Sequence, residues 1–555
     1  MLEQIKKQIK EIVCKNMKVS NVVVEEPKRG NSDLAIPLFG VAKEIGKPVN
    51  LVFEDIKDIV IKLDMVSKIE FAAGFLNIFL NRDKFSFLAL KNIYELGDNY
   101  GQKAKNGKTL VIDYSSPNIA KAFSVGHLRS TMIGNALKNI YLKEGYDVVG
   151  INHLGDWGTQ FGKMIVAYEK WGNEEVIKKD PTSELQKLYV KFHVEAKKHI
   201  ELEDEARVAF KKLENKDEKY TKIWEWIKDV SVADLMNMYN RLSVSFDSYL
   251  GEAFYNDKMD AVVKELEDKG LLEVDQGASI VKLDDMPPAI IKKSDGTTLY
   301  MTRDLAALLY RYKTYHFDKI IYVVGNEQKL HFEQLKAVIK KMGYNLDIEH
   351  VNFGLVLFDG KKLSSRNGIN AKLEDVLNDA VKQAKKAILE KNPDLRNQKI
   401  VSEAVGIGAI LFNDLKNERH LDYDLNLENM LKFEGQTGPY LQYSSVRIAS
   451  ILKSEKLDIK KVNQKYFSEE HYFELIKILS QFSSIIEKAQ SANSPAIIAR
   501  YILGLGQAFN SFYGRQKIVV EDSGHKNANL LLINDVRIVV NLGLRLLGIK
   551  PLNEM

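Results

Sequence analysis

A buried strand, a loop of small residues and a helix follow one another directly in residues 109–144. The β-branched run at 109–112 is typical of a central parallel strand, and the apolar residues after it recur at helical spacing. Gly126 stands at the turn, where a residue without Cβ lets the backbone approach a ligand closely. The start of the helix offers free N–H groups and a positive dipole, and His127 and Lys121 add donors. This segment therefore predicts a site for nucleotide phosphates.

The rest of the chain is organised around this segment. Continuously apolar strands alternate with helices, which predicts an α/β fold with a parallel sheet covered on both faces. The strands are expected near 109–114, 147–153, 319–324 and 351–358, with none after about residue 368. The expected domains are a small α/β unit at 1–105, the parallel-sheet domain at 106–370 with a helical insertion at about 163–290, connecting helices at 371–433, and an all-α bundle at 434–555.

Composition excludes several classes of protein. At 555 residues the chain is too long for one hydrophobic core. It contains no apolar run of the length needed to span a membrane and no apolar signal core, so the cytoplasm is the expected location. A single cysteine, Cys14, excludes a disulfide framework or a cysteine-based metal site, and no metal site is expected. The net charge of +5 permits nucleic-acid binding without indicating it.

A second phosphate candidate lies at 359–368, where lysines, serines and an arginine follow the last expected strand. On its pattern alone this run fits a solvated basic turn as well as a loop that closes over a triphosphate. Two basic elements at strand ends of one sheet suit nucleotidyl transfer, in which catalysis is mostly positioning and charge stabilisation. No P-loop sequence occurs anywhere in the chain.

Together the two elements resemble the paired HIGH and KMSKS motifs of class I aminoacyl-tRNA synthetases. Surrounding blocks narrow the resemblance to arginyl-tRNA synthetases, and it covers essentially the whole chain. The blocks are SPNIAK at 116–121, GHLRST at 126–131, NHLGDWGTQFG at 152–162, LYMTRD at 299–304 and GQTGPYLQY at 435–443. The resemblance implies a Rossmann-like catalytic domain that activates L-arginine with ATP and Mg²⁺, a monomer, and transfer of arginine to tRNA(Arg).

The resemblance also implies the ATP contacts. Catalytic contacts to the phosphates are expected from Lys121, His127 and Lys362. The nucleotide is expected to contact Ser124, Gly126, His127, Lys362 and Ser364. The chain departs from the family pattern at Ser124, which replaces the first histidine of HIGH. The run at 362–366 keeps the first lysine of KMSKS and has serine in place of the second, a role that Lys121 is expected to take.

Arginine selection requires a carboxylate that can pair with a guanidinium. Tyr300 and Asp304 are four residues apart on an expected helix and so share one face. By resemblance this pair holds the arginine side chain, Asp113 and Asn118 hold its α-amino end, and Gln328 lines the pocket. The pattern alone favours a pair between Asp304 and a neighbouring lysine or arginine on a solvated face.

The tRNA contacts are expected at both ends of the chain. Tyr440, Tyr443 and Arg447 recur at helical spacing, which by itself is more typical of core packing than of a stacking face. The resemblance makes this helix the contact for the anticodon loop, with Met555 close to it. It likewise places Phe75 and Asn77 at the tRNA elbow, although packing explains Phe75 equally well.

Two other functions remain open for the sequence alone. A small-molecule adenylyltransferase shares the strand–loop–Gly-His turn but has no use for the terminal domains. An RNA-binding paralogue with weakened catalysis would explain Ser124, although Lys121, His127, Asp304 and Lys362 are all retained.

Overall fold

The computed structural model describes residues 1–27, 31–294, 300–358, 360–362 and 372–555. A parallel sheet lies at the centre, with strand order β10-β9-β4-β5. Its strands are β4 (Thr109–Asp113), β5 (Asp147–Ile151), β9 (Lys319–Tyr322) and β10 (Asp347–His350). The helices α5 (Val125–Lys143), α12 (Tyr300–Tyr315) and α13 (Lys329–Lys341) connect or follow these strands. The predicted α/β class with a parallel sheet is confirmed.

Two strand predictions are wrong. The fourth strand of the parallel sheet is β10, whereas the run expected at 351–358 contributes only β11 (Val356–Phe358) to a different sheet. In that sheet β11 lies between β12 (Lys361–Lys362) and β13 (Tyr423–Asp424), so a strand does occur after residue 368. β13 is too short to give an alternating pattern, and its partner is distant in sequence, so neither pairing could be seen locally.

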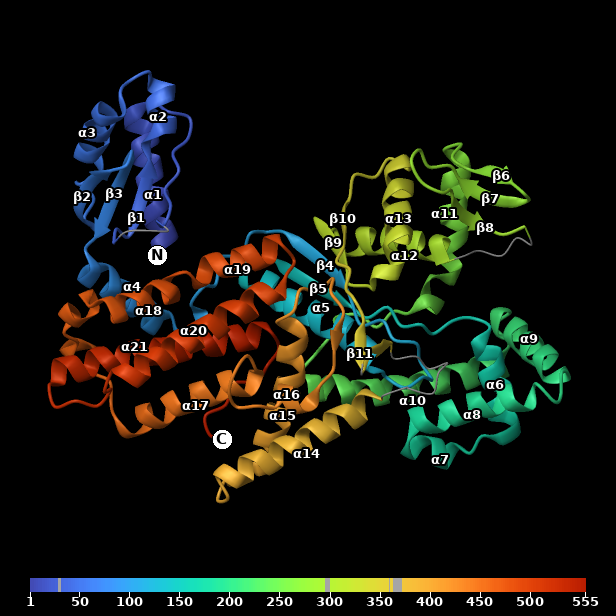
Figure 1. Cartoon of the computed structure of the whole chain (residues 1–555). Helices are drawn as coiled ribbons and strands as arrows, with labels where there is room; N and C mark the ends of the chain where they lie inside the picture. The colour runs from blue at the N-terminus through green and yellow to red at the C-terminus, as the bar shows by residue number, and fades with distance from the viewer. Residues whose placement is uncertain (28–30, 295–299, 359, 363–371) are drawn as a thin grey trace.

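A mostly helical insertion extends from the sheet between β5 and α12 (Figure 1). Its helices are α6 (Gln160–Trp171), α7 (Glu174–Lys179), α8 (Pro181–Glu195), α9 (Glu201–Glu214) and α10 (Glu218–Leu242). They are followed by η2 (Glu252–Lys258), α11 (Met259–Asp268) and the antiparallel strands β6 (Glu273–Asp275), β7 (Ala278–Val281) and β8 (Ala289–Lys292). The insertion therefore returns to the sheet beside the start of α12.

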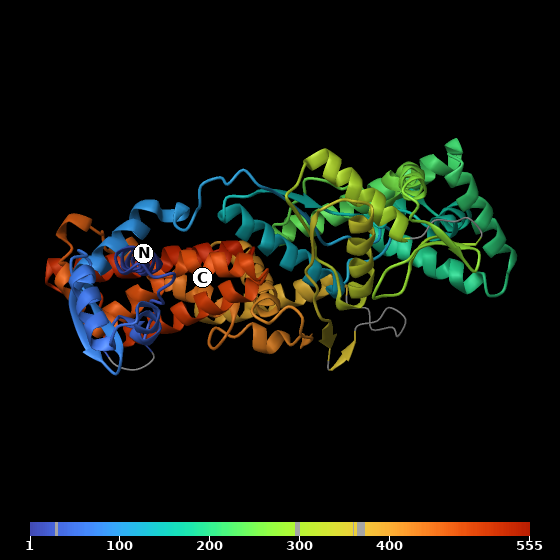
Figure 2. The same cartoon turned by 90° about the horizontal axis from the view of Figure 1, so that it is seen from above.

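The N-terminal unit is a small sheet with helices on it. Its sheet contains β1 (Leu34–Pro37), β2 (Val66–Ala72) and β3 (Phe75–Leu80), and its helices are α1 (Leu2–Met17), α2 (Leu38–Ile45) and α3 (Val49–Val60). The next helix, α4 (Arg82–Leu96), packs against the C-terminal bundle, where Phe85 meets Phe473 with ring centroids 5.8 Å apart. Figure 2 shows this unit beside the bundle, far from the insertion.

The C-terminal part is all helical apart from β13. After α14 (Leu373–Lys391), α15 (Gln398–Leu415) and the single turn α16 (Leu427–Met430) come the helices of the bundle. These are α17 (Gly438–Ser454), α18 (Glu470–Ser480), α19 (Phe482–Ser491), α20 (Pro495–Arg515) and α21 (Ser523–Leu546). Short turns of 3₁₀ helix lie at η1 (Gly97–Asn99), η3 (Asn326–Gln328), η5 (Ile459–Lys461) and η6 (Gln464–Ser468). None of the described helices is long and apolar enough to cross a membrane.

A carboxylic acid is buried in the middle of this bundle. Asp535 of α21 is fully buried, and its Oδ2 lacks a hydrogen-bond partner among the described residues. Burial raises the pKa of Asp535 well above its ordinary value. Since the pKa in the folded chain exceeds that in the unfolded chain, the neutral acid is tolerated at low pH. Stability is then lost as the pH rises toward the folded pKa.

Replacing Asp535 with asparagine should therefore stabilise the protein at pH 8 by about 1–3 kcal/mol, the usual cost of a buried unsatisfied polar group. Thermal unfolding at pH 5 and at pH 8 measures the effect, and the difference between variant and parent should shrink at the lower pH. An equal gain at both pH values would show that the carboxyl is already ionised at pH 5 in the folded chain, so that its pKa is not raised.

Candidate active site

The predicted phosphate site begins at the loop between β4 and α5, which is held in an unusual conformation. Ser115, Ser116 and Ala120 have φ of 73°, 47° and 58°, values that residues with a side chain rarely adopt. Hydrogen bonds stabilise the loop: Ser115 N–H donates to Ser130 Oγ (2.9 Å) and Ser116 N–H donates to Asn152 Oδ1 (3.2 Å). The loop is thus built at the carboxyl edge of the sheet, where ligands of open α/β sheets bind.

Asn118 projects from this loop beside Gly155. The two residues form an isolated parallel bridge, and a Cβ on Gly155 would stand 2.0 Å from Asn118 Oδ1. Gly155 is therefore required for the place that Asn118 occupies. This explains physically why a glycine stands within the NHLGDWGTQFG block.

His127 is locked into one tautomer. The backbone N–H of Ser124 donates to His127 Nδ1 at 3.1 Å, and Ser124 Oγ lies 3.0 Å from the same nitrogen. An N–H can only donate, so Nδ1 is the acceptor and Nε2 carries the proton. Burial, with a smaller contribution from Lys121, lowers the pKa of His127 to about 4, so the ring is neutral at pH 7. The imidazole is therefore a directed donor and not a cation.

The same contacts give Ser124 a role that the sequence did not indicate. It is the N-cap of α5, and its side chain supports His127. Gly126 follows at the first turn of α5, where the nearest atom to an added Cβ is Ser124 Oγ at 3.5 Å. The protein itself would therefore accept a side chain at Gly126. The space left by the glycine is available to a ligand instead. Partial burial lowers the pKa of Lys121, which lies close enough to His127 to affect it.

The strand that leads into the second predicted phosphate element, β11, belongs to the small sheet β12-β11-β13, so the two elements do not follow strands of one sheet as predicted. Lys362 is the last residue of β12, opposite Leu357 of β11. Ser364 lies outside the described residues. Just after this segment, Lys372 forms a backbone bridge with Ser124, and Leu373 N–H donates to Phe123 O at 3.0 Å. The residues that follow the second element, Lys372 and Leu373, therefore adjoin the first.

The predicted arginine-binding residues gather around the carboxyl ends of β4 and β9. Asp113 ends β4, and its Oδ2 accepts from Arg311 Nη1 of α12 at 2.7 Å. Asp304 of α12 is half-buried, and its Oδ2 lies 2.6 Å from Nε2 of His331. The charges of both aspartates raise the pKa of buried Tyr322, although burial itself is the larger cause. Both carboxylates therefore lie close to Tyr322.

These contacts answer the alternative considered for Asp304. Its partner is a histidine on α13 and not a lysine or arginine on a solvated face. Tyr300 begins α12 and is 70% exposed, so it stands at the mouth of the pocket and not inside it. Gln328 ends η3 and is exposed. Asp113 is already paired with Arg311, a partner that the sequence did not indicate because it lies 198 residues away.

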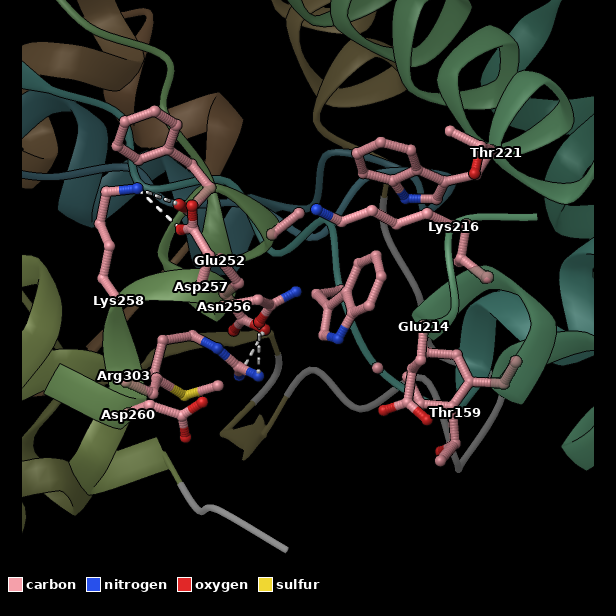
Figure 3. Close-up of a pocket in the computed structure, with 18 of the residues that line it drawn as sticks. Thr159, Glu214, Lys216, Thr221, Glu252, Asn256, Asp257, Lys258, Asp260 and Arg303 are labelled. Carbon is pink, nitrogen blue, oxygen red and sulfur yellow. Dashed lines mark hydrogen bonds and ion pairs between the residues drawn. The ribbon is translucent and has the colours of Figure 1, made fainter. Parts of the chain in front are cut away.

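A cleft of about 1210 Å³ opens beside these residues (Figure 3). It lies between α9 and α10 of the insertion and η2, α11 and the start of α12. The lining includes two tryptophans and several lysines, namely Trp157, Trp224, Lys216, Lys222, Lys258, Lys292 and Lys293, together with the carboxylates of Glu214, Glu218, Glu225, Glu252, Asp257 and Asp260. Asp156, which precedes the lining residue Trp157, is fully buried, pairs with Lys228 at 2.7 Å and accepts from Ala253 N–H at 2.8 Å.

Glu252, in this cleft, was missed by sequence reasoning. Its Oε2 lies 3.2 Å from Arg303 Nη1, and Figure 3 shows the pair on the wall of the cleft. Burial raises the pKa of Glu252 to about 7, with the charges of Asp304 and Asp156 adding to the effect. No motif marks Glu252, because its environment comes from three separate segments.

The predicted tRNA contacts lie far from this cleft. On α17 the Arg447 guanidinium lies 5.2 Å from the ring centroids of both Tyr443 and Tyr513. Lys391 of α14 lies over Tyr443 at 5.8 Å, and its neighbour Asn392 donates to Met555 O at 3.1 Å. The structure therefore brings Met555 to the same end of the bundle as Tyr443.

Two further predicted tRNA contacts have distinct surroundings. Tyr440 is half-buried, and its hydroxyl accepts from Asn510 Nδ2 at 2.6 Å. In the N-terminal unit Phe75 and Asn77 share the half-exposed face of β3, while the intervening Leu76 is buried. Neither of these environments by itself indicates a contact to tRNA.

Comparison with known proteins decides the family. Residues 89–427 match the model described as tRNA synthetases class I (R), catalytic domain, residues 441–555 match the DALR anticodon binding domain, and residues 1–80 match the arginyl tRNA synthetase N terminal domain. An arginine–tRNA ligase of Exiguobacterium sibiricum is 49% identical over 540 residues, 96% of this chain and 95% of that one. The chain belongs to the arginyl-tRNA synthetase family.

Other relatives agree with this result. An arginine–tRNA ligase of Pediococcus pentosaceus is 47% identical over 96% of this chain and 95% of its own. The crystal structure of the Plasmodium falciparum arginyl-tRNA synthetase, 26% identical, covers 99% of both chains with a TM-score of 0.81. The Thermus thermophilus arginyl-tRNA synthetase, 22% identical, shares the fold with a TM-score of 0.83 over 100% of both chains.

The synthetase is thus an ATP-using ligase that joins arginine to tRNA(Arg). This result replaces the two alternatives considered for the sequence alone. The matched regions include terminal domains that a small-molecule adenylyltransferase does not need.

Proposed function

We propose that the pocket between β4, α12 and η2 selects arginine by two carboxylates. Asp304 is the charge partner of the guanidinium, and Glu252 lies near enough for the two charges to affect each other. Tyr300 closes the pocket at the mouth, Gln328 lines it, and Asn118 with Asp113 receives the α-amino end. The observation that carries this proposal is the gathering of acidic groups from distant segments in one partly buried place, since a buried guanidinium requires carboxylate partners.

The adenylation step follows from the neighbouring groups. The arginine carboxylate attacks the α-phosphate of ATP, and pyrophosphate leaves as arginyl-adenylate forms. Lys121 and Lys362 offset the charge that develops on the phosphates, and His127 Nε2–H donates a hydrogen bond from a fixed direction. Ser124 serves by holding His127. Mg²⁺ enters with the nucleotide, whose phosphate oxygens are the hard ligands it prefers.

The Glu252 assignment predicts a pH dependence. Below pH 7 the carboxyl is mostly protonated and neutral, and above pH 7 it is a carboxylate that attracts the guanidinium. The KM for arginine should therefore fall several-fold as the pH rises from about 6 to about 8. Steady-state arginylation across this range measures the profile, and Glu252→Gln should flatten it.

The matched control is Glu225→Gln, which alters another acidic residue of the same cleft, on α10. This variant should keep the parental slope. An unchanged slope in Glu252→Gln would remove Glu252 from arginine binding.

For tRNA, we infer that the cleft beside the insertion contacts the 3′ end and that the C-terminal bundle contacts the anticodon loop. The cleft with its tryptophans and lysines suits the single-stranded 3′ end, because aromatic rings stack on bases while ammonium groups neutralise phosphates. Tyr443, Arg447, Tyr440 and Met555 serve the anticodon loop, and Phe75 with Asn77 serves the elbow. In this proposal the unit at 1–105 and the bundle at 434–555 bind tRNA. The region at 106–370, with its insertion at about 163–290, carries the chemistry. The helices at 371–433 connect this catalytic region to the C-terminal bundle.

Replacing Tyr443 with leucine should weaken tRNA binding by about 1–3 kcal/mol, roughly 5- to 150-fold in Kd, which is the usual worth of one stacking ring. The KM for arginine should not change. Filter binding of tRNA(Arg) measures the loss. Tyr466→Leu is the control, because Tyr466 is another partly buried ring of the C-terminal region, stacked on His525 with centroids 3.9 Å apart. Equal losses of tRNA affinity in both variants would show that Tyr443 only packs within the bundle.

We also propose that the synthetase acts as a monomer in the cytoplasm. Its single cysteine suits a reducing compartment. Light scattering after size-exclusion chromatography tests the oligomeric state.

A further inference from the structure

A buried arginine joins the two phosphate elements. Arg129 lies on α5 two residues after His127 and is 1% exposed. Its Nη1 donates to two backbone carbonyls, Gly354 O and Leu421 O, both at 2.8 Å. These carbonyls stand just before β11 and β13, the paired strands at the base of the hairpin that carries Lys362.

A carboxylate balances the charge of this arginine. Arg129 Nε lies 2.8 Å from Asp414 Oδ1, and the two side chains are 1% and 0% exposed. The guanidinium also lies 5.0 Å from the ring centroid of Tyr423 in β13. A buried ion pair of this kind contributes little net stability compared with apolar residues of similar size. Its contacts fix positions instead, because a guanidinium presents its donors in a rigid planar fork.

The backbone at the base of the hairpin is closely packed, so it cannot shift without moving its neighbours. A Cβ on Gly354 would stand 2.6 Å from both Asp422 Oδ1 and the backbone of Leu421. Leu355 N–H donates to Asp422 Oδ1 at 2.6 Å, and Tyr423 N–H donates to Leu355 O at 3.1 Å. A shift of the carbonyls bound by Arg129 would therefore move β11 and β13 together.

We propose that Arg129 is a positioning residue for the ATP site, holding the hairpin that bears Lys362 at a set place relative to the α5 terminus that bears His127. This inference rests on the ATP roles proposed above for Lys362 and His127. Arg129 itself touches no substrate. Its contribution is the fixed spacing between two groups that must act on one triphosphate, and small misplacements of such groups are costly.

The test separates position from stability. Arg129→Met should raise the KM for ATP at least tenfold and leave the KM for arginine and the Kd for tRNA within twofold. It should lower the Tm, because the buried Asp414 then lacks the cation that balances its charge. The double variant Arg129→Met with Asp414→Leu restores a neutral interior and should recover most of the Tm. Its KM for ATP should stay raised. Recovery of a parental KM for ATP in this double variant would overturn the proposal.

Two controls complete the experiment. Lys143→Met removes another buried cation of α5, whose Nζ donates to Asp98 O at 2.9 Å, and should leave the KM for ATP unchanged. Lys362→Ala tests the proposed function on its own, since an unchanged KM for ATP there would remove Lys362 from the ATP site whatever Arg129 does. Combined with Arg129→Met, it should raise the KM for ATP by less than the product of the single effects. Fully independent effects would show that Arg129 does not act through the hairpin.

Discussion

Replacing Asp304 with alanine is expected to raise the KM for arginine by roughly 30- to 5,000-fold while leaving the Kd for tRNA nearly unchanged. The physical reason is that the guanidinium would enter a partly buried pocket with one carboxylate missing. Losing one partner of a desolvated charge pair costs about 2–5 kcal/mol. Arginylation at varied arginine concentration, with tRNA binding measured separately, gives both numbers.

A matched control keeps this result interpretable. Asp260→Ala also removes a carboxylate from the cleft wall, but on α11. It should leave the KM for arginine within about twofold, since exposed charges contribute little. Because Asp304 also contacts His331, a variant that lost tRNA binding and arginine use together would mean that the contact is structural.

The second large effect is expected at Lys121. Changing it to alanine should slow arginyl-adenylate formation about 10²- to 10³-fold, the usual cost of losing one group that stabilises transition-state charge. ATP–pyrophosphate exchange in the presence of tRNA measures this step. The loss should appear mainly in kcat, because the contact strengthens as charge develops on the phosphates.

Lys416 provides the comparison for Lys121. Partial burial lowers the pKa of both lysines, but Lys416 Nζ donates to the backbone carbonyl of Gln436 at 3.0 Å. Lys416→Ala should exchange pyrophosphate at the parental rate. A Lys121→Ala enzyme with normal exchange would contradict the role given to that lysine.

The prediction of the fold succeeded where the signal was local. The β4–α5 segment could be recognised from its β-branched run, its small-residue loop and its helical periodicity, all within one stretch of chain. The strand expected at 351–358 was misplaced for the opposite reason. β10 and β11 follow each other closely but belong to different sheets, and their partners, β9 and β13, lie on opposite sides of them in sequence.

The site shows the same division. The residue types at Lys121, His127, Tyr300 and Asp304 could be named from the chain, because motifs list side chains in order. The protonation states of these side chains could not be predicted from the sequence. Burial lowers the pKa of His127, and the N–H of Ser124 sets its tautomer. Burial also raises the pKa of Glu252 to about 7, with the charges of Asp304 and Asp156 adding to the effect. Such shifts depend on distances and burial that no linear pattern contains.

The order of residues was thus sufficient to indicate the chemistry. Binding a guanidinium requires carboxylates, and binding a triphosphate requires lysines and a helix N-terminus. These residue types occur in recognisable runs of the sequence. Tertiary packing settled which groups meet. Arg311 reaches Asp113 across 198 residues, and Arg129 reaches Leu421 across 292. Contacts over such separations form only when the sheet and helices assemble, because side-chain interactions depend on distance in space and not along the chain.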